Sequence, residues 1–305
     1  MANKREAKKR IAAWGSLLAA GISVAGLGKA AKAPVAVVRD VEYGRGGTVP
    51  LYMDLCYPLA AVKKPNPVIV MIHGGGWMGG DRSDQIKSMT AYAAEGYFCA
   101  SVGYRLSQVA IFPAQIHDCK CAIRYLRSHA KEYNLDPDRI GAVGWSAGGH
   151  LVALLGTSGG VRELEGDGGW PGVDSRVQAV CDYFGPADFP AWASDPGFAS
   201  WGMDAKNALY KLFGGPIPDR LELARQASPV TWVGKGAPPF LIIHGTADDI
   251  VPFRQSELLR DALKKAGVPV ELVTIAGAAH GDGKFWEGKP WEKEAVFFEK
   301  HLKKR

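Results

Sequence analysis

Ser146 stands between two glycines in the segment GWSAGG, residues 144–149. The apolar run at residues 140–145 predicts a buried strand, and residues 147–155 have the pattern of a helix that begins at once. A strand–turn–helix junction of this kind lifts a serine hydroxyl above a sheet edge, and the flanking glycines prevent collisions. We therefore predict that Ser146 is a nucleophile; a tight structural turn is the alternative.

A serine hydroxyl becomes reactive when a histidine takes its proton and a carboxylate orients that histidine. Of the seven histidines, only His280 falls in a loop of small residues after the last expected strand. The preferred carboxylate is Asp248, which lies nearer a strand end than Asp249, and a helix-capping role is the alternative for either. The chain order Ser146, Asp248, His280 is the one expected for groups on successive strand ends.

Three consecutive glycines follow another apolar run, in the segment HGGGW at residues 73–77. Consecutive glycines carry an entropic cost, so they indicate that something approaches the main chain closely. We predict that the N–H groups of Gly75, Gly76 and Ala147 stabilise an oxyanion, with Trp77 as a further donor. A flexible glycine loop is the alternative, whereas a phosphate loop is disfavoured because no G-K-[ST] follows.

The elements that must position these groups alternate along the chain, which predicts an α/β fold with a mostly parallel sheet and helices on both faces. In such sheets reactive residues gather at the carboxyl ends of the strands. Strands are expected at residues 35–43, 50–57, 67–72, 97–102, 140–145, 177–183, 239–243 and 268–275. Helices are expected at residues 83–95, 116–133, 147–155, 253–266 and 291–302.

The segment 159–236 is rich in aromatic residues and turns, and it is a candidate loop-rich cap over the site. Ordinary core and loop packing is the equal alternative. The loop 282–291 flanks His280 and adds further aromatic side chains. The candidate substrate-binding residues are Trp77, Trp192, Trp201 and Trp286.

The net charge of +6 is confined to the start of the chain, where residues 1–33 carry seven Lys or Arg and one Glu. This basic segment, the uncharged run 11–28 and the A-K-A at 31–33 form the pattern of a secretory signal peptide. We predict cleavage after Ala33, a catalytic domain at 34–305, and a secreted or periplasmic protein without stable membrane association. An uncleaved anchor is the alternative, and the charge is no argument for a nucleic-acid partner.

The composition of the 305 residues, 47% hydrophobic and 22% charged, excludes wholesale disorder. No clustered Cys or His spacing predicts a metal site, and we expect no cofactor. The five cysteines lie in expected strands and one expected helix, which favours small buried apolar residues. One disulfide remains the alternative.

The motifs HGGGW, GWSAGGH (144–150), HGTADDIVP (244–252) and AGAAHG (276–281) resemble those of α/β-hydrolase esterases. Residues 104–127 and 135–158 resemble the secreted bacterial branch of feruloyl and acetylxylan esterases, near the carboxylesterases of the hormone-sensitive-lipase type. The resemblance covers roughly residues 36–303. It departs at Cys121, where family members often have an aliphatic residue.

The resemblance implies an α/β-hydrolase fold, with Ser146, Asp248 and His280 as a catalytic triad and Gly75, Gly76 and Ala147 as oxyanion donors. It implies a serine carboxylesterase, which we expect to act on acetyl or feruloyl esters of plant polysaccharide. A small ester or a polysaccharide ester is the expected partner, and the oligomeric state is left open. The alternatives are a peptidase resembling prolyl oligopeptidases, an amidase, and a non-catalytic binding protein on a hydrolase fold.

Overall fold

The computed structural model describes residues 33–59, 64–198, 203–286 and 288–303. The predicted signal peptide lies outside the described residues apart from Ala33, and so does Trp201.

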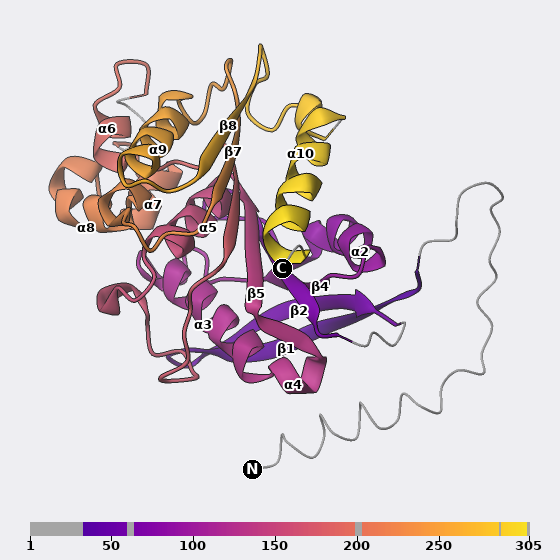
Figure 1. Cartoon of the computed structure of the whole chain (residues 1–305). Helices are drawn as coiled ribbons and strands as arrows, with labels where there is room; N and C mark the ends of the chain where they lie inside the picture. Colours follow the sequence, from indigo (N-terminus) through magenta and orange to yellow (C-terminus); the bar gives the residue numbers. More distant parts are fainter. Residues whose placement is uncertain (1–32, 60–63, 199–202, 287, 304–305) are drawn as a thin grey trace. The chain divides into compact units, whose positions relative to one another are not determined.

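An eight-stranded sheet forms the centre of the described part, with the strand order β1-β2-β4-β3-β5-β6-β7-β8 (Figure 1). The strand β2 runs antiparallel to β1 and β4, and the neighbouring strands from β4 to β8 are paired in parallel. The predicted mostly parallel sheet is therefore confirmed. The strands are β1 (Val35–Gly46), β2 (Val49–Pro58), β3 (Asn66–Ile72), β4 (Phe98–Val102), β5 (Leu135–Trp145), β6 (Ala179–Tyr183), β7 (Phe240–Gly245) and β8 (Val270–Ile275).

Helices cover both faces of this sheet. The strand β3 is buried along its whole length, and its residues alternate between two apolar clusters, with Val70 in one and Ile69 in the other. The longest helices are α2 (Ile86–Ala94), α3 (Ala114–Ser128), α5 (Ala147–Thr157), α9 (Arg254–Lys265) and α10 (Lys289–Phe298). Helices α3, α5 and α9 contribute to the cluster of Val70, and α2 and α10 to that of Ile69, as two covered faces require.

Shorter helices complete the fold. They are α4 (Ala130–Tyr133), α6 (Phe189–Ala193), α7 (Ala208–Phe213) and α8 (Leu221–Ala227). Single turns of 3-10 helix lie at Arg82–Gln85, Arg162–Leu164, Ile217–Arg220, Pro229–Trp232 and Gly283–Phe285, and a π-helical turn lies at Glu299–Lys303. Within the described residues, no helix combines the length and the apolarity needed to cross a bilayer.

The helix expected at residues 116–133 is divided in the structure. Helix α3 ends at Ser128, the backbone of His129 turns to φ −103° and ψ 14°, and α4 follows. The ring of His129 lies on that of Tyr125 and its Nδ1–H donates to the Tyr125 carbonyl, so it occupies an acceptor at the end of α3. Asn134 then ends α4 in the left-handed conformation, with φ 50°. The apolar periodicity of the sequence continues across residues 128–130, so the pattern did not reveal the break between the two helices.

The five cysteines are free and buried, as small apolar residues would be. Cys121 packs between α3 and β1: its Sγ lies 3.7 Å from the carbonyl oxygen of Tyr43. A Cβ atom on Gly44 would lie only 2.5 Å from the same sulfur. The space for the side chain of residue 121 is therefore small, and an aliphatic residue larger than cysteine would collide with β1.

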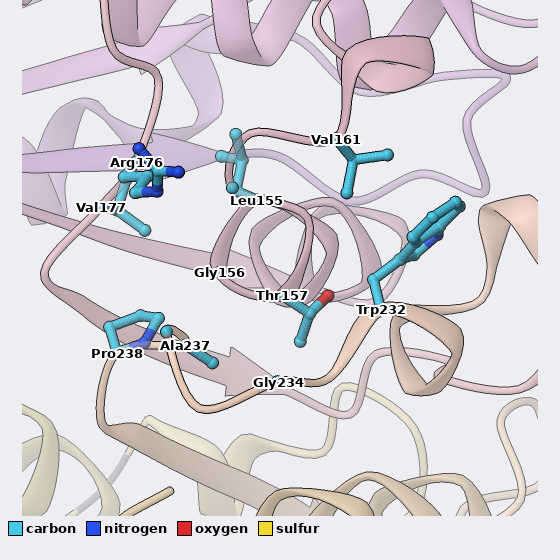
Figure 2. A pocket seen from close by; sticks show the side chains of 12 residues that line it. Leu155, Gly156, Thr157, Val161, Arg176, Val177, Trp232, Gly234, Ala237 and Pro238 are labelled. Atoms are coloured by element: carbon cyan, nitrogen blue, oxygen red, sulfur yellow. The ribbon is translucent and has the colours of Figure 1, made fainter. Parts of the chain in front are cut away.

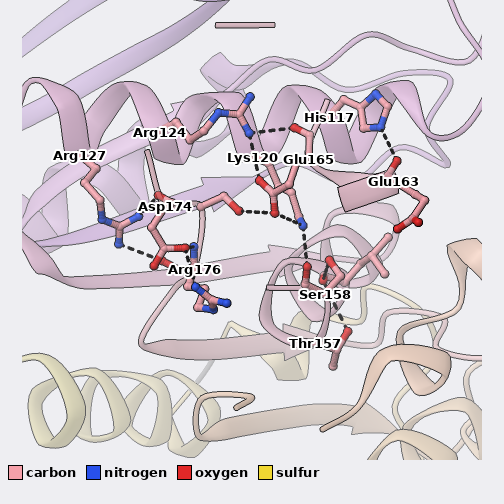
Figure 3. A network of polar contacts seen from close by, with 12 residues as sticks. His117, Lys120, Arg124, Arg127, Thr157, Ser158, Glu163, Glu165, Asp174 and Arg176 are labelled. Atoms are coloured by element: carbon pink, nitrogen blue, oxygen red, sulfur yellow. Dashed lines mark hydrogen bonds and ion pairs between the residues drawn. The ribbon is translucent and has the colours of Figure 1, made fainter. Parts of the chain in front are cut away.

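The candidate cap at 159–236 is not a single structure. Its first part is held to α3, away from the nucleophile, by the buried Lys120, whose Nζ donates to the carbonyl of Ser158 at 2.7 Å and to Glu165 at 2.8 Å (Figure 3). Arg124 donates to the other Glu165 carboxylate oxygen at 3.2 Å and to the Gly169 carbonyl. The strand β6 follows, and only then come helices α6 to α8. The first part of the segment therefore packs as a strap along α3, and a cap over the site remains a prediction for its later helices.

We expect Glu165→Gln to lower the free energy of unfolding by roughly 2–4 kcal/mol, because it leaves the buried Lys120 ammonium without its counter-charge. Chemical denaturation followed by circular dichroism measures this. The matched control is Glu163→Gln, since Glu163 is exposed and its change should cost less than about 0.5 kcal/mol. Equal stability of the two variants would contradict the role given to Glu165.

Candidate functional site

Ser146 sits on a strained turn between β5 and α5. Its backbone has φ 55° and ψ −117°, a conformation that side chains rarely adopt. A Cβ atom on Gly144 would lie 2.2 Å from the Gly148 carbonyl oxygen, and one on Gly148 would lie 2.0 Å from the Ile72 carbonyl oxygen. Both residues must therefore be glycine, because any side chain would collide with these backbone oxygens. The Ser146 N–H donates to the carbonyl of Tyr183 at 2.9 Å, which anchors the turn to β6.

Ser146, His280 and Asp248 form one line of hydrogen bonds. The Oγ of Ser146 lies 2.9 Å from Nε2 of His280, and Nδ1 of His280 lies 2.7 Å from Oδ2 of Asp248. An ionised carboxylate only accepts hydrogen bonds, so Nδ1 of His280 carries the proton. The lone pair of Nε2 then faces the serine hydroxyl, which is the arrangement a general base requires.

A second histidine, His244, also contacts Asp248. Its Nε2 lies 3.1 Å from Oδ2 of Asp248, and its Nδ1 lies 2.7 Å from the hydroxyl of Ser256. Because the carboxylate accepts, Nε2 of His244 is the protonated nitrogen and Nδ1 accepts from Ser256. Sequence analysis did not identify this contact; the position of His244 four residues before Asp248 was the available signal.

The carboxylate of Asp248 is buried but remains ionised. The N–H groups of Ile250 and Val251 donate to its Oδ1 at 2.9 and 2.8 Å. Burial by itself would raise the pKa of Asp248, but the hydrogen bonds from the two histidines outweigh burial and hold the pKa far below its usual range. Asp249 is exposed by contrast. The structure thus brings Asp248, and not Asp249, to the histidine.

The glycine loop after β3 lies beside the serine. A Cβ atom on Gly74 would lie 3.5 Å from the Cβ of Ser146, and one on Gly75 would lie 2.3 Å from the Gly79 carbonyl oxygen. Gly75 and Gly76 have φ angles of 104° and 59°, in the region that favours glycine. His73 braces the loop, since its Nδ1–H donates to the Gly74 carbonyl at 2.8 Å.

The backbone donors near Ser146 are unoccupied. Within the described residues, no hydrogen-bond acceptor faces the N–H groups of Gly75, Gly76 or Ala147. Ala147 is the first residue of α5, where helix N–H groups lack partners and the helix dipole is positive. These N–H groups belong to the glycine loop and to the first turn of α5, the two segments next to Ser146.

Two of the four predicted substrate-binding tryptophans lie in the core, which corrects the prediction for them. Trp77 and Trp192 are each only 2% exposed and both pack against Phe189. The indole N–H of Trp77 donates to Nδ1 of His150. Aromatic residues suit a buried core and a pocket wall equally well, so composition could not separate the two. Trp286, in contrast, is 53% exposed.

A buried carboxyl group lies beneath the site, on α10. The hydroxyls of Tyr92 and Tyr183 donate to Glu294 at 2.7 and 2.5 Å. Tyr183 is also the residue whose carbonyl holds the Ser146 N–H. Burial raises the pKa of Glu294 to about 7, although the two tyrosine hydroxyls favour the charged form. Glu294 therefore links the helix α10 to the strand that supports the nucleophile.

A pocket of about 210 Å³ lies at the other end of α5 (Figure 2). Its walls include Leu155 and Thr157 at the end of that helix, together with Trp232, Arg176 and Pro238. Ser146 precedes the first residue of α5, so this pocket and the serine lie at opposite ends of the helix. The pocket is separate from the site described above.

Comparison with known proteins points to esterases. The family model BD-FAE matches residues 53–263. Esterase LipQ of Mycobacterium tuberculosis is 32% identical over 79% of this chain and 56% of its own length. A solved carbohydrate esterase from gut microbiota, in a truncated form, has 31% identity and a TM-score of 0.77 over 91% of this chain and 100% of that one. An acetyl ester-xyloside bifunctional hydrolase from Caldicellulosiruptor lactoaceticus has 26% identity and a TM-score of 0.64, over 84% of this chain and 86% of its own.

The chain spans about half the length of the first curated relatives that it matches, all three of them mycobacterial proteins. It covers the whole of the truncated gut carbohydrate esterase. The solved structures confirm the predicted α/β-hydrolase fold.

Asp248→Asn should slow the labelling of Ser146 by a fluorophosphonate probe by roughly 10³-fold or more, because an amide can donate to Nδ1 of His280 and favour the wrong tautomer. Mass spectrometry of the intact protein measures the labelling rate. Asp249→Asn is the matched control and should label within about twofold of the wild type. A slow Asp249→Asn variant beside a fast Asp248→Asn variant would assign the role to Asp249.

The protonated Glu294 should stabilise the folded protein at about pH 4, and this contribution should be lost as the pH rises to about 7, because the folded protein retains the Glu294 proton over this range and the unfolded chain does not. The buried His150, whose pKa burial lowers to about 4, acts in the opposite direction, so the comparison is made between variants. Glu294→Gln should remove this contribution to the free energy of unfolding, which amounts to on the order of 1–3 kcal/mol between pH 4 and pH 7. Part of the pH dependence should remain in this variant because of Asp182, since burial also raises the pKa of Asp182 to about 7. Denaturation midpoints at several pH values test this.

The control for this titration is Glu292→Gln, on the exposed side of the same helix. It should leave the pH slope of stability unchanged. An unaltered slope in Glu294→Gln would show that Glu294 titrates normally in the folded protein.

Proposed function

This chain belongs to the BD-FAE family, and from that premise we propose that it is a carboxylic ester hydrolase acting through an acyl-enzyme on Ser146. The observation that carries the proposal is the hydrogen-bonded line from the Oγ of Ser146 through His280 to Asp248, beside unoccupied backbone N–H groups. The names of its relatives support ester hydrolysis, as the LipQ esterase and the gut carbohydrate esterase illustrate.

The first half of the proposed reaction forms the acyl-enzyme. The Oγ of Ser146 attacks the ester carbonyl carbon while Nε2 of His280 takes the hydroxyl proton. The carbonyl oxygen becomes negative and accepts hydrogen bonds from Gly75, Gly76 and Ala147. When the C–O bond to the alcohol breaks, His280 gives the same proton to the departing alcohol oxygen. Asp248 stays ionised throughout and stabilises the imidazolium.

The second half repeats these steps with water. Nε2 of His280 takes a proton from the water as its oxygen attacks the acyl carbon. The oxyanion donors hold the second tetrahedral intermediate, which then collapses as the bond to Oγ of Ser146 breaks. His280 returns the proton to the serine, so the net reaction converts one ester and one water into one acid and one alcohol.

The substrate class we propose is acetyl or feruloyl esters on plant polysaccharide. Two solved relatives support a carbohydrate ester: one is a carbohydrate esterase and the other an acetyl ester-xyloside hydrolase. The space beside the glycine loop is limited, since a Cβ atom on Gly76 would lie 3.2 Å from the Cβ of Ala208 on α7. Helix α7 therefore packs directly on the glycine loop.

We also propose that the protein is exported. The support is the order of a basic segment, an uncharged run and the A-K-A at residues 31–33. The sequence that remains after cleavage at Ala33 is formally neutral. N-terminal sequencing of the protein recovered from outside the cytoplasm tests this, and a start at residue 34 is expected.

Ser146→Ala should reduce the hydrolysis of p-nitrophenyl acetate by at least about 10³-fold, because the variant has no hydroxyl to form the acyl-enzyme. Release of p-nitrophenol gives the rate, and circular dichroism controls for folding. Ser158→Ala is the matched control, since Ser158 lies at the far end of α5 and should leave the rate nearly unchanged. Undiminished turnover in Ser146→Ala would overturn the mechanism.

A substrate panel decides the acyl group. Acetylated xylan, methyl ferulate and p-nitrophenyl esters of increasing chain length should show a preference for short acyl chains if α7 limits the acyl space. Preference for long chains would contradict a polysaccharide ester. Cleavage of peptides or amides without cleavage of esters would replace the esterase with a peptidase or an amidase.

A further inference from the structure

Trp286 exposes a large aromatic surface on the loop that follows His280. Its side chain is 53% exposed, although the preceding residue, Phe285, is completely buried. The ring of Phe285 contacts that of Phe184, with 4.7 Å between centroids, and so pins the loop to the end of β6. The exposed indole is therefore presented from an anchored position.

The inner face of Trp286 rests on other aromatic rings. It stacks on Tyr183, with centroids 6.0 Å apart and planes at 22°, and it contacts Trp145 at 6.1 Å. Trp145 in turn stacks on Tyr183 at 5.8 Å and 28°. Trp145 and Tyr183 are 7% and 1% exposed, so they support the indole from below. We call these three side chains the aromatic platform.

The platform is fixed in place by a buried polar contact. The hydroxyl of Tyr183 donates to Glu294 at 2.5 Å, and Glu294 receives a second hydrogen bond from Tyr92. This contact fixes the hydroxyl end of the Tyr183 ring, on whose face Trp286 stacks. A platform built in this way loses little conformational entropy when a flat ligand binds.

The platform lies on one particular side of the reaction centre. Phe184 follows Tyr183 in the chain and meets the ring of His280 edge-on, at 4.7 Å. His280 delivers the proton to the departing alcohol, so the alcohol must leave on the histidine side of Ser146. The loop that carries Trp286 begins at His280, whereas Ala208 and the oxyanion donors lie by the glycine loop.

We propose that the aromatic platform is the subsite for the sugar ring of the alcohol that the enzyme releases. A pyranose or furanose ring presents an apolar face of C–H groups, and a flat exposed indole is the complementary surface. The proposal rests on the proposed ester hydrolysis and adds to it the residues that hold the sugar ring of the alcohol. An aromatic acyl group would remain on Ser146 and would not occupy this subsite.

The test compares two esters with the same acyl group and different alcohols: an acetylated methyl xyloside and ethyl acetate, whose alcohol has no ring. Trp286→Ala should lower kcat/KM for the xyloside about 3- to 10-fold, mainly through KM, because a stacking contact is lost. The same variant should change kcat/KM for ethyl acetate less than about twofold. Feruloyl arabinoside and ethyl ferulate form the equivalent pair if the panel favours feruloyl groups.

Two further variants control the comparison. Trp286→Phe keeps an aromatic face and should recover most of the activity on the xyloside. Trp232→Ala removes a partly buried tryptophan at the far end of α5 and should leave both rates unchanged (Figure 2).

Each remaining outcome contradicts a specific statement. Equal losses on the two esters would show that Trp286 only supports the His280 loop and would overturn the subsite. Unchanged rates on both would overturn it as well. If the wild-type protein releases acid from none of the four esters, the proposed function itself fails, and the subsite fails with it.

Discussion

The packing of the first turn of α5 against the ends of β3 and β5 is the constraint on which the site depends. A Cβ atom at Gly144 or Gly148 would come within 2.2 or 2.0 Å of a backbone oxygen. The helix and the strands can therefore approach this closely only because both residues are glycine. That approach forces Ser146 to φ 55° and turns its hydroxyl out of the sheet. The surrounding sheet, buried on both faces, is what maintains this strained backbone.

Two buried carboxyl groups near the site show how their surroundings assign different roles. Asp248 accepts from His280, His244 and two backbone N–H groups, and its pKa is low enough to keep it ionised. Glu294 accepts from the hydroxyls of Tyr92 and Tyr183, and burial raises its pKa to about 7. The first group suits the stabilisation of an imidazolium, and the second suits a rigid support for β6.

The segment between α5 and β7 contacts both α3 and the glycine loop. Its first part is tied to α3 through Lys120 and Arg124 (Figure 3). Its later helices reach the glycine loop, where Ala208 approaches Gly76. Trp286 belongs to a different loop and lies on the histidine side. In the proposed reaction, the acyl and alcohol parts of an ester would meet separate segments of the chain.

The sequence by itself identified the chemical groups and their order: Ser146, Asp248 and His280, the glycine loop, and the strands, which are local apolar runs. It did not reveal the break at His129, because apolar periodicity continues across it. Only the tertiary structure brought His244 to Asp248, buried Trp77 and Trp192, and left Trp286 exposed. Local patterns set residue type and secondary structure, whereas burial and hydrogen-bond partners depend on contacts between residues distant in the chain.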